Sequence, residues 1–173
     1  MADRQCVASY FGFSISFIDT LRAVDAIGNH DMTDVADRVT ELNRNAPGFI
    51  RLLGGEITEL ALDEQKATFV FTVPLEYCHS VDIVQGGFVT AMLDAAMSHA
   101  VFGTDGTITG LATLNISTQY LGICRGNQPL RVSGWIKQAT HRTAFFEGHI
   151  VSADGSLVAT AQSVAKVSRQ QAP

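Results

Sequence analysis

One apolar stretch constrains the fold more than any other part of the chain. After a pair of glycines, residues 88–102 read FVTAMLDAAMSHAVF, and neither Gly nor Pro interrupts them. Such a run predicts a helix over 87–102, and because its apolar residues lie on nearly all sides, the helix should be buried in the core. Asp94 is the single carboxylate in this run. An unpaired buried carboxylate is energetically costly, so Asp94 must have a partner or a function.

Strand-like patterns flank this helix on both sides. Before it, residues 50–63 and 66–74 read as two strands, joined by a predicted hairpin turn at Asp63-Glu64-Gln65. After it come four runs of strand length, which we expect to form a meander: residues 111–121, 130–140, 143–154 and 156–168. The last two are joined by Asp154-Gly155, a two-residue hairpin signal.

A shorter surface helix is predicted upstream, from Met32 up to the stop at Pro47-Gly48, because Val35, Val39 and Leu42 have helical spacing. The element order predicts an α+β protein with a curved antiparallel sheet wrapped around one long central helix. Such a sheet has two open edges, and pairing with a second copy of the chain is a natural way to cover one.

The bulk composition excludes several functional classes. The net charge is −5 and the 12 Lys and Arg residues are scattered, so we expect no nucleic-acid partner. The three cysteines form no CxxC pair, which favours a reducing compartment, and the His and Cys spacing predicts no metal site. No apolar run reaches the ~18–20 residues of a membrane span. We therefore expect no membrane partner.

The N-terminal part of the chain does not read as a signal peptide. Its apolar residues are preceded by Asp3 and interrupted by Asp19, without a clean cleavage site. We therefore predict a cytoplasmic protein with an N-terminal extension of unknown role over residues 1–30 and a single domain over residues 31–170.

The glycine pair and Asp94 together suggest a site. Gly86 and Gly87 lie at the start of the helix, whose first N–H groups have no partner within the helix and can stabilise a developing negative charge. Thr90, Asp94 and Ser98 follow at four-residue spacing on one stripe. This stripe is either the polar, solvent-facing side of the helix or the lining of a pocket. In the second case Asp94 serves as general base or nucleophile, with the Gly87 N–H as oxyanion donor.

These residues resemble a known family. The segment CHSVDIVQGGFVTAMLDAAMSHA is similar to the motif of hot-dog-fold acyl-CoA thioesterases of the phenylacetate-degradation type, which runs Asn-x-x-Gly-x-x-His-Gly-Gly with a carboxylate seven residues after the second glycine. Gly86, Gly87 and Asp94 match that spacing. The resemblance covers roughly residues 46–167, including PGFIRLLGGEITEL, TLNISTQYL and HRTAFFEGHIVSADGSLVATA. It implies the hot-dog fold and hydrolysis of an acyl-CoA thioester.

The chain departs from the motif at three positions. Gln85 replaces the family's His, His79 its Asn, and Asp82 its Gly. Gln can donate or accept a hydrogen bond but cannot move protons near neutral pH, so Gln85 should orient the substrate while Asp94 handles the proton. His79 either replaces the contact of the lost Asn or lies at a subunit interface.

The resemblance implies roles for further residues. Thr113 matches a Ser or Thr that helps to hold the attacking water, or it is an ordinary β-branched strand residue. Arg142 matches a basic residue that reaches the phosphates of coenzyme A, or it is a solvated charge at a strand end. Phe88 is expected to line the acyl pocket, with contacts from another subunit.

The predicted function is hydrolysis of an acyl-CoA with an aromatic or medium-chain acyl group, without a cofactor, in a homodimer or a dimer of dimers. Coenzyme A enters only as part of the substrate. One alternative is a non-catalytic acyl-CoA-binding module, which the missing motif His keeps open. Another is an acyl-thioester hydratase or dehydratase, which would need a catalytic His near the carboxylate, whereas His99 should point elsewhere on the helix.

Overall fold

The computed structural model describes residues 32–170, so the predicted extension over residues 1–30 lies outside the described residues. Contacts divide the chain into two units, Met1–Asp34 and Val35–Pro173. The sheet, the hydrophobic core and the candidate site all belong to the second unit. No helix among residues 32–170 is both long and apolar enough to span a membrane.

Two helices and two strands precede the central helix: α2 (Met32–Arg44), α3 (Gly48–Leu52), β1 (Gly55–Ala61) and β2 (Lys66–Thr72). The hairpin predicted between the two strands is confirmed, and Gln65 adopts a positive φ of 49° in its turn. The strand predicted over residues 50–63 is wrong in its first part. Pro47 acts as the N-cap of α3, whose Ile50 is buried, so Pro47-Gly48 separates two helices instead of ending one.

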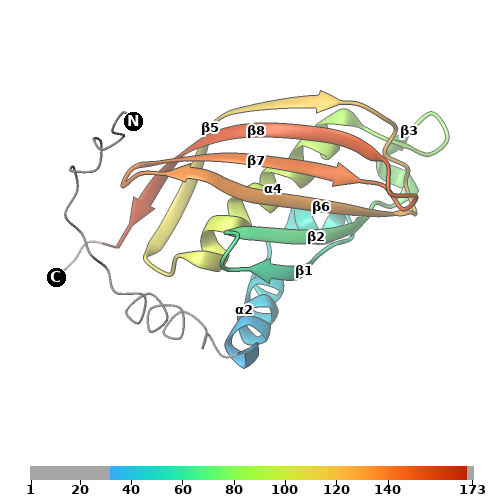
Figure 1. The fold of residues 1–173 in the computed structure, drawn as a ribbon. Helices are drawn as coiled ribbons and strands as arrows, with labels where there is room; N and C mark the ends of the chain where they lie inside the picture. The colour runs from blue at the N-terminus through green and yellow to red at the C-terminus, as the bar shows by residue number, and fades with distance from the viewer. Residues whose placement is uncertain (1–31, 171–173) are drawn as a thin grey trace, which may run out of the picture. The chain divides into compact units, whose positions relative to one another are not determined.

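The central helix α4 (Gly86–Thr104) is confirmed and runs two residues further than expected. Gly103 does not end it: a Cβ there would lie 2.7 Å from Leu60 Cδ2, so this glycine lets β1 pack closely on the helix. Nine of its residues are buried, as its composition predicted. Two further short strands, β3 (Cys78–His79) and β4 (Ile83–Val84), precede α4 and pair with each other. Figure 1 shows α4 crossing one face of the sheet, with its start near β3.

Helix and sheet approach each other closely at a glycine of β6. A Cβ on Gly134 would lie 2.4 Å from the backbone nitrogen of Met97. The backbone of α4 therefore rests almost directly on β6. Gly148 on the neighbouring strand likewise approaches the side chains of Met97 and Leu93.

The remaining strands are β5 (Ile108–Tyr120), β6 (Pro129–Ala139), β7 (Thr143–Val151) and β8 (Leu157–Arg169). All neighbours in the sheet are antiparallel, in the order β1-β2-β6-β7-β8-β5. Three of the four late strands form the expected meander, and Gly155 supplies the hairpin with a φ of 86°. The fourth does not follow the prediction: β5 pairs with β8, because α4 carries the chain across the sheet to its far edge (Figure 1).

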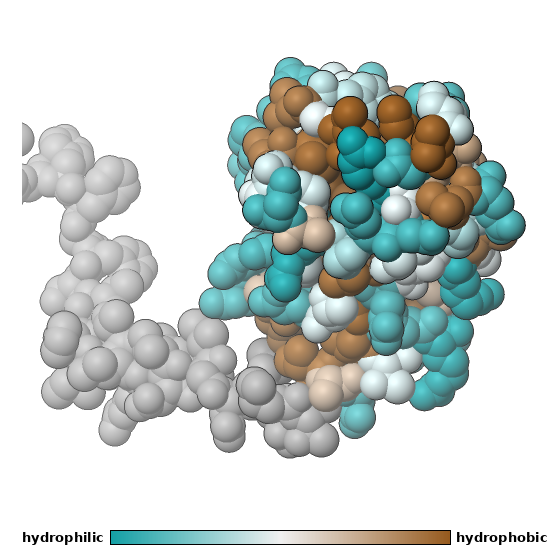
Figure 2. All heavy atoms as spheres, turned by 90° about the vertical axis from the view of Figure 1, so that its right-hand side faces the viewer, coloured by the Kyte–Doolittle hydropathy of each residue, from teal (hydrophilic) through white to brown (hydrophobic). Residues whose placement is uncertain are grey.

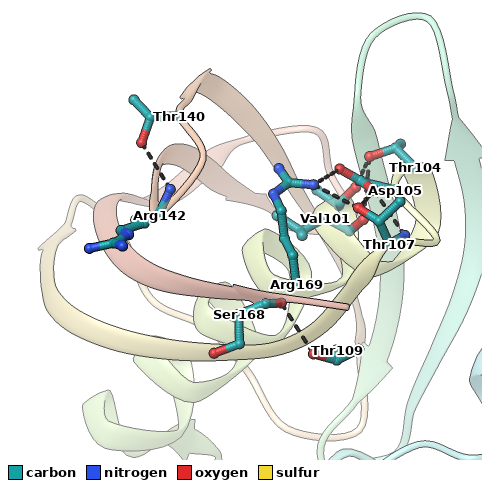
Figure 3. A network of polar contacts seen from close by, with 10 residues as sticks. Val101, Thr104, Asp105, Thr107, Thr109, Thr140, Arg142, Ser168 and Arg169 are labelled. Atoms are coloured by element: carbon teal, nitrogen blue, oxygen red, sulfur yellow. Dashed lines mark hydrogen bonds and ion pairs between the residues drawn. The ribbon is translucent and has the colours of Figure 1, made fainter. Parts of the chain in front are cut away.

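A polar network ties the end of β8 to the loop after α4 (Figure 3). Arg169 forms an ion pair with Asp105 and donates a hydrogen bond to Thr107 Oγ1 at 2.8 Å. Hydrogen bonds from Thr107 and Arg169 lower the pKa of Asp105 below its usual value. This network closes the end of the sheet opposite the start of α4.

Candidate active site

Asp94 lies on the side of α4 that faces β5, where it meets Thr113. The Thr113 hydroxyl donates a hydrogen bond of 2.9 Å to Asp94 Oδ1. Asp94 is half-buried and Thr113 is exposed. The carboxylate is therefore neither sealed in the core nor surrounded by bulk water, and its second oxygen can bind another donor.

A β-bulge in β5 aims Thr113 at this carboxylate. The pairing of β5 with β8 shifts between Thr113 and Asn115, so Leu114 is an extra residue on the bulged strand. The shift brings an odd-numbered residue, Thr113, and two later even-numbered ones, Thr118 and Tyr120, to the same face of β5. All three contact α4. Simple alternation would place them on opposite faces of the strand.

The start of α4 presents open backbone amides. Gln85 is the N-cap residue and is exposed, and its side chain forms no capping hydrogen bond. Its carbonyl accepts the N–H groups of Phe88 and Val89, at 2.9 and 3.2 Å. Gly86 and Gly87 precede these residues, and helix geometry leaves their N–H groups without an intrahelical acceptor.

The two glycines have different surroundings. A Cβ on Gly87 would have nothing within 4 Å, whereas a Cβ on Gly86 would lie 3.3 Å from the ring of Tyr120. Gly87 is exposed. A ligand can therefore approach the Gly87 amide freely, while Gly86 accommodates the tyrosine.

Thr90 belongs to a hydroxyl cluster that links α4 to β5. Its Oγ1 lies 3.0 Å from Thr118 Oγ1 and 2.8 Å from the Tyr120 hydroxyl, which in turn donates to the Gly86 carbonyl at 3.0 Å. Sequence reasoning missed Tyr120. The only signal was its place at the end of TLNISTQYL, and a strand pattern does not tell which helix residue a side chain meets.

The other predicted residues are spread around this end of α4. Ser98, one turn beyond Asp94, is half-buried and has no side-chain hydrogen bond within residues 32–170. His79 is exposed, pairs with Ile83 through its backbone, and has its Nδ1 3.1 Å from Ser80 Oγ. Phe88 is half-buried and packs edge-to-face against Tyr77, with ring centroids 5.6 Å apart.

Asp82, which replaces the motif glycine, has a clear structural partner. Both of its carboxylate oxygens lie 2.8 Å from Arg125 Nη1, and its carbonyl accepts the N–H of Gly126. The loop before α4 is thus joined to the segment after β5. This departure from the motif therefore fixes the approach to the glycine pair.

Arg142 lies at the Thr113 end of the sheet. Thr113 pairs with Ala165 of β8, and Ala165 pairs with Ala144 of β7, two residues after Arg142. Its guanidinium is exposed, extends away from Thr140 (Figure 3), and has no ion-pair partner among residues 32–170. It is a cation available to an anionic ligand.

Two hollows of the sheet lie away from Asp94. One of about 320 Å³ is lined by Trp135, Glu147 and His149, and the other, of about 380 Å³, by Lys137 and Phe145. Since their neighbours Gly134 and Gly148 face α4, these side chains lie on the opposite face of the sheet. Neither of these two hollows is therefore a candidate substrate pocket for Asp94.

The end of the molecule where α4 begins carries exposed apolar side chains. Figure 2 looks onto this end, and hydrophobic residues gather there around hydrophilic ones. The exposed large hydrophobic residues of its loops are Leu75, Val81, Leu121 and Ile123. Such a surface suits contact with an apolar ligand or with another subunit.

His99 is not placed for chemistry with Asp94. It is buried, its Nδ1–H donates to the Ala95 carbonyl at 2.8 Å, and its ring packs edge-to-face on Phe69. Burial lowers its pKa, which favours the neutral ring. It is a core residue on the β2 side of the helix.

Comparisons with known proteins agree with this geometry. Residues 82–159 match the family model of the thioesterase superfamily. A phenylacetic acid degradation-related protein from Ralstonia eutropha superposes with a TM-score of 0.68 at 26% identity, covering 75% of this chain and 99% of its own. PaaI from the phenylacetic acid degradation operon of E. coli gives a TM-score of 0.68 at 15% identity, covering 82% and 97%.

A search among curated proteins found no match. The predicted hot-dog fold is confirmed, and residues 82–159 carry the thioesterase superfamily pattern, in agreement with the resemblance drawn from the glycine pair and Asp94.

Proposed function

We propose that this protein hydrolyses an acyl-CoA, with an aromatic or medium-chain acyl group, to the free acid and coenzyme A. The observation that carries the proposal is the half-buried Asp94 carboxylate, which accepts a hydrogen bond from Thr113 on a helix that begins with two open glycine amides. Thioester hydrolysis requires two groups. One is a carboxylate that takes a proton from the attacking water, and the other is a backbone amide that donates to the carbonyl oxygen.

In the proposed reaction the thioester carbonyl oxygen accepts the Gly87 N–H. Asp94 takes a proton from a water held near Thr113 and Ser98, and the water oxygen bonds to the carbonyl carbon; direct attack by Asp94 is the alternative. The negative charge that develops on the carbonyl oxygen is stabilised at the start of α4. When the carbonyl re-forms, the C–S bond breaks and the thiolate of coenzyme A leaves. This chemistry uses only side chains, backbone and water.

One chain does not bring these two groups together. Gly87 and Asp94 are seven residues apart on α4, which corresponds to about 10 Å at ~1.5 Å per residue. This separation is long for a single water to bridge, which favours a site shared between two helices. We therefore propose that Asp94 acts on a substrate bound at Gly87 of a second copy. The open edge strand β5, with Leu114 and Tyr120 exposed, is the proposed pairing surface.

The remaining candidate residues would bind the substrate. The guanidinium of Arg142, which has no ion-pair partner in the described part of the chain, suits the phosphates of coenzyme A. Gln85 and His79 border the start of α4 and would orient the thioester, and Phe88 would contact the acyl group. Gln85 is exposed and uncapped, so its amide can donate to or accept from the substrate.

The test is Asp94→Asn, assayed by release of free thiol over a panel of acyl-CoA substrates. The amide keeps the shape and loses the basicity, so the turnover number should fall by about 10²–10⁴-fold, the contribution of a positioned base. Asp37→Asn on α2, an equally small change at an exposed position, is the matched control and should retain activity. Undiminished turnover in Asp94→Asn on a good substrate rules out the mechanism.

One observation favours a second candidate function. Gln85 cannot transfer protons, so the chain lacks the motif group that would assist the leaving thiolate. A non-catalytic acyl-CoA-binding module would give tight binding by calorimetry without any release of thiol. The buried, neutral His99 gives no support to a hydratase.

A further inference from the structure

The hydrogen bond from Tyr120 falls on the peptide group that carries the proposed oxyanion donor. The Tyr120 hydroxyl donates to the Gly86 carbonyl at 3.0 Å. The Gly86 carbonyl and the Gly87 N–H belong to one planar peptide unit. A hydrogen bond that orients or polarises the Gly86 carbonyl therefore also acts on the Gly87 N–H, across the peptide bond.

The position of the Tyr120 hydroxyl is fixed from two directions. Since the Gly86 carbonyl carries no proton, Tyr120 must be the donor, and its oxygen is left to accept from Thr90 at 2.8 Å. The Thr90 hydroxyl has one proton, which it can give either to Tyr120 or to Thr118, 3.0 Å away. Thr90, Thr118 and Tyr120 thus form one hydroxyl cluster, and Tyr120 links it to the Gly86 carbonyl.

The glycine pair supports the same conclusion. A Cβ on Gly86 would lie 3.3 Å from the ring of Tyr120, so a side chain there would press against the ring. A Cβ on Gly87 would meet only open space. The first glycine thus admits the tyrosine and the second admits a ligand. Tyr120 is itself 56% exposed, so the hydrophobic effect alone does not explain why its ring lies here.

We propose that Tyr120 is a positioning residue that orients and strengthens the Gly87 N–H as a hydrogen-bond donor. The inference rests on the proposed thioesterase function and adds to it a residue outside the glycine–aspartate motif. A hydrogen bond to the carbonyl of an amide draws electron density from its nitrogen and makes its N–H a better donor. It also holds the peptide plane in place before a substrate binds, which is what a preorganised oxyanion site requires.

The test is Tyr120→Phe, which keeps the ring and removes the hydroxyl. Since loss of a whole oxyanion donor costs about 10²–10³-fold in turnover, weakening one should reduce kcat by about tenfold and leave KM nearly unchanged. Tyr77→Phe is the matched control, because Tyr77 lies outside the hydroxyl cluster. It should keep the wild-type kcat. Thermal unfolding of both variants should match the wild type.

A second measurement does not depend on activity. In protein labelled with nitrogen-15 glycine, the Gly87 amide resonance, assigned by its absence from Gly87→Ala, should move upfield in nitrogen-15 in Tyr120→Phe. Thr118→Val removes the acceptor that competes with Tyr120 for the Thr90 proton, so it should move the resonance in the opposite direction, and by less. An unmoved Gly87 resonance with an unchanged kcat overturns the inference. If the wild type releases no thiol from any acyl-CoA, the proposed function fails, and the resonance alone decides whether Tyr120 is coupled to Gly87.

Discussion

Single residues decide what the Asp94 carboxylate can do. The residue type and its place in an apolar helix were readable from the sequence, as was the spacing from Gly87. The partner was not, because Thr113 has the pattern of any β-branched strand residue. Only the bulge at Leu114 turns the Thr113 hydroxyl toward Asp94, and a one-residue irregularity leaves no mark in an alternating pattern.

Thr113→Val tests the hydrogen bond at the carboxylate. Val keeps the branched shape and removes the donor, so Asp94 loses its partner and holds the water less well. We expect turnover to fall by about 10- to 150-fold, in line with a net hydrogen-bond contribution to a charged group of about 1.5–3 kcal/mol. Thr109→Val, on the same strand and exposed, is the control for loss of a threonine hydroxyl. If both variants keep full turnover in the thiol-release assay, Thr113 has no part in catalysis.

At the scale of elements, helices were easier to predict than strand partners. The central helix follows from a long run without breakers, and its two ends shifted by only one or two residues. The position of β5 beside β8 did not follow, because alternation reports which face of a strand is buried and nothing about its neighbour. The chain reaches that edge because α4 spans the sheet between β2 and β5.

The contact between α4 and β6 should tolerate no added atom. In Gly134→Ala the new methyl group would lie 2.4 Å from the Met97 nitrogen and 2.6 Å from the Met97 Cα, both backbone atoms. Neither can rotate away, so helix and sheet must separate. We expect the free energy of unfolding to fall by about 3 kcal/mol, at the upper end for overpacked cores.

The matched control for this change is Gly106→Ala, where a Cβ would meet nothing within 4 Å. Its free energy of unfolding should stay within about 0.5 kcal/mol of the wild type, as for ordinary surface substitutions. Urea unfolding monitored by tryptophan fluorescence gives both values, since Trp135 neighbours Gly134. Equal stability of the two alanine variants contradicts the close packing of α4 on β6.

For the whole molecule, the separation of Gly87 from Asp94 has the largest consequence. It is about 10 Å along one helix, and under the proposed mechanism we expect a working site to take each group from a different copy. This can be tested with two inactive variants. Asp94→Asn lacks the base, and Gly87→Pro lacks the N–H donor while keeping a residue that the first turn of a helix tolerates.

Neither variant alone should release thiol at more than a trace rate, because every site in it is defective. Mixing them in equal amounts under conditions that exchange subunits gives dimers of which half are mixed, and each mixed dimer has one site with both groups intact. About a quarter of wild-type turnover should therefore return in a two-fold symmetric dimer. A site built within one chain predicts no recovery at all, since every chain in the mixture still has one of the two defects. Thiol release from the mixture, followed against the time of exchange, therefore decides between the shared and the single-chain site.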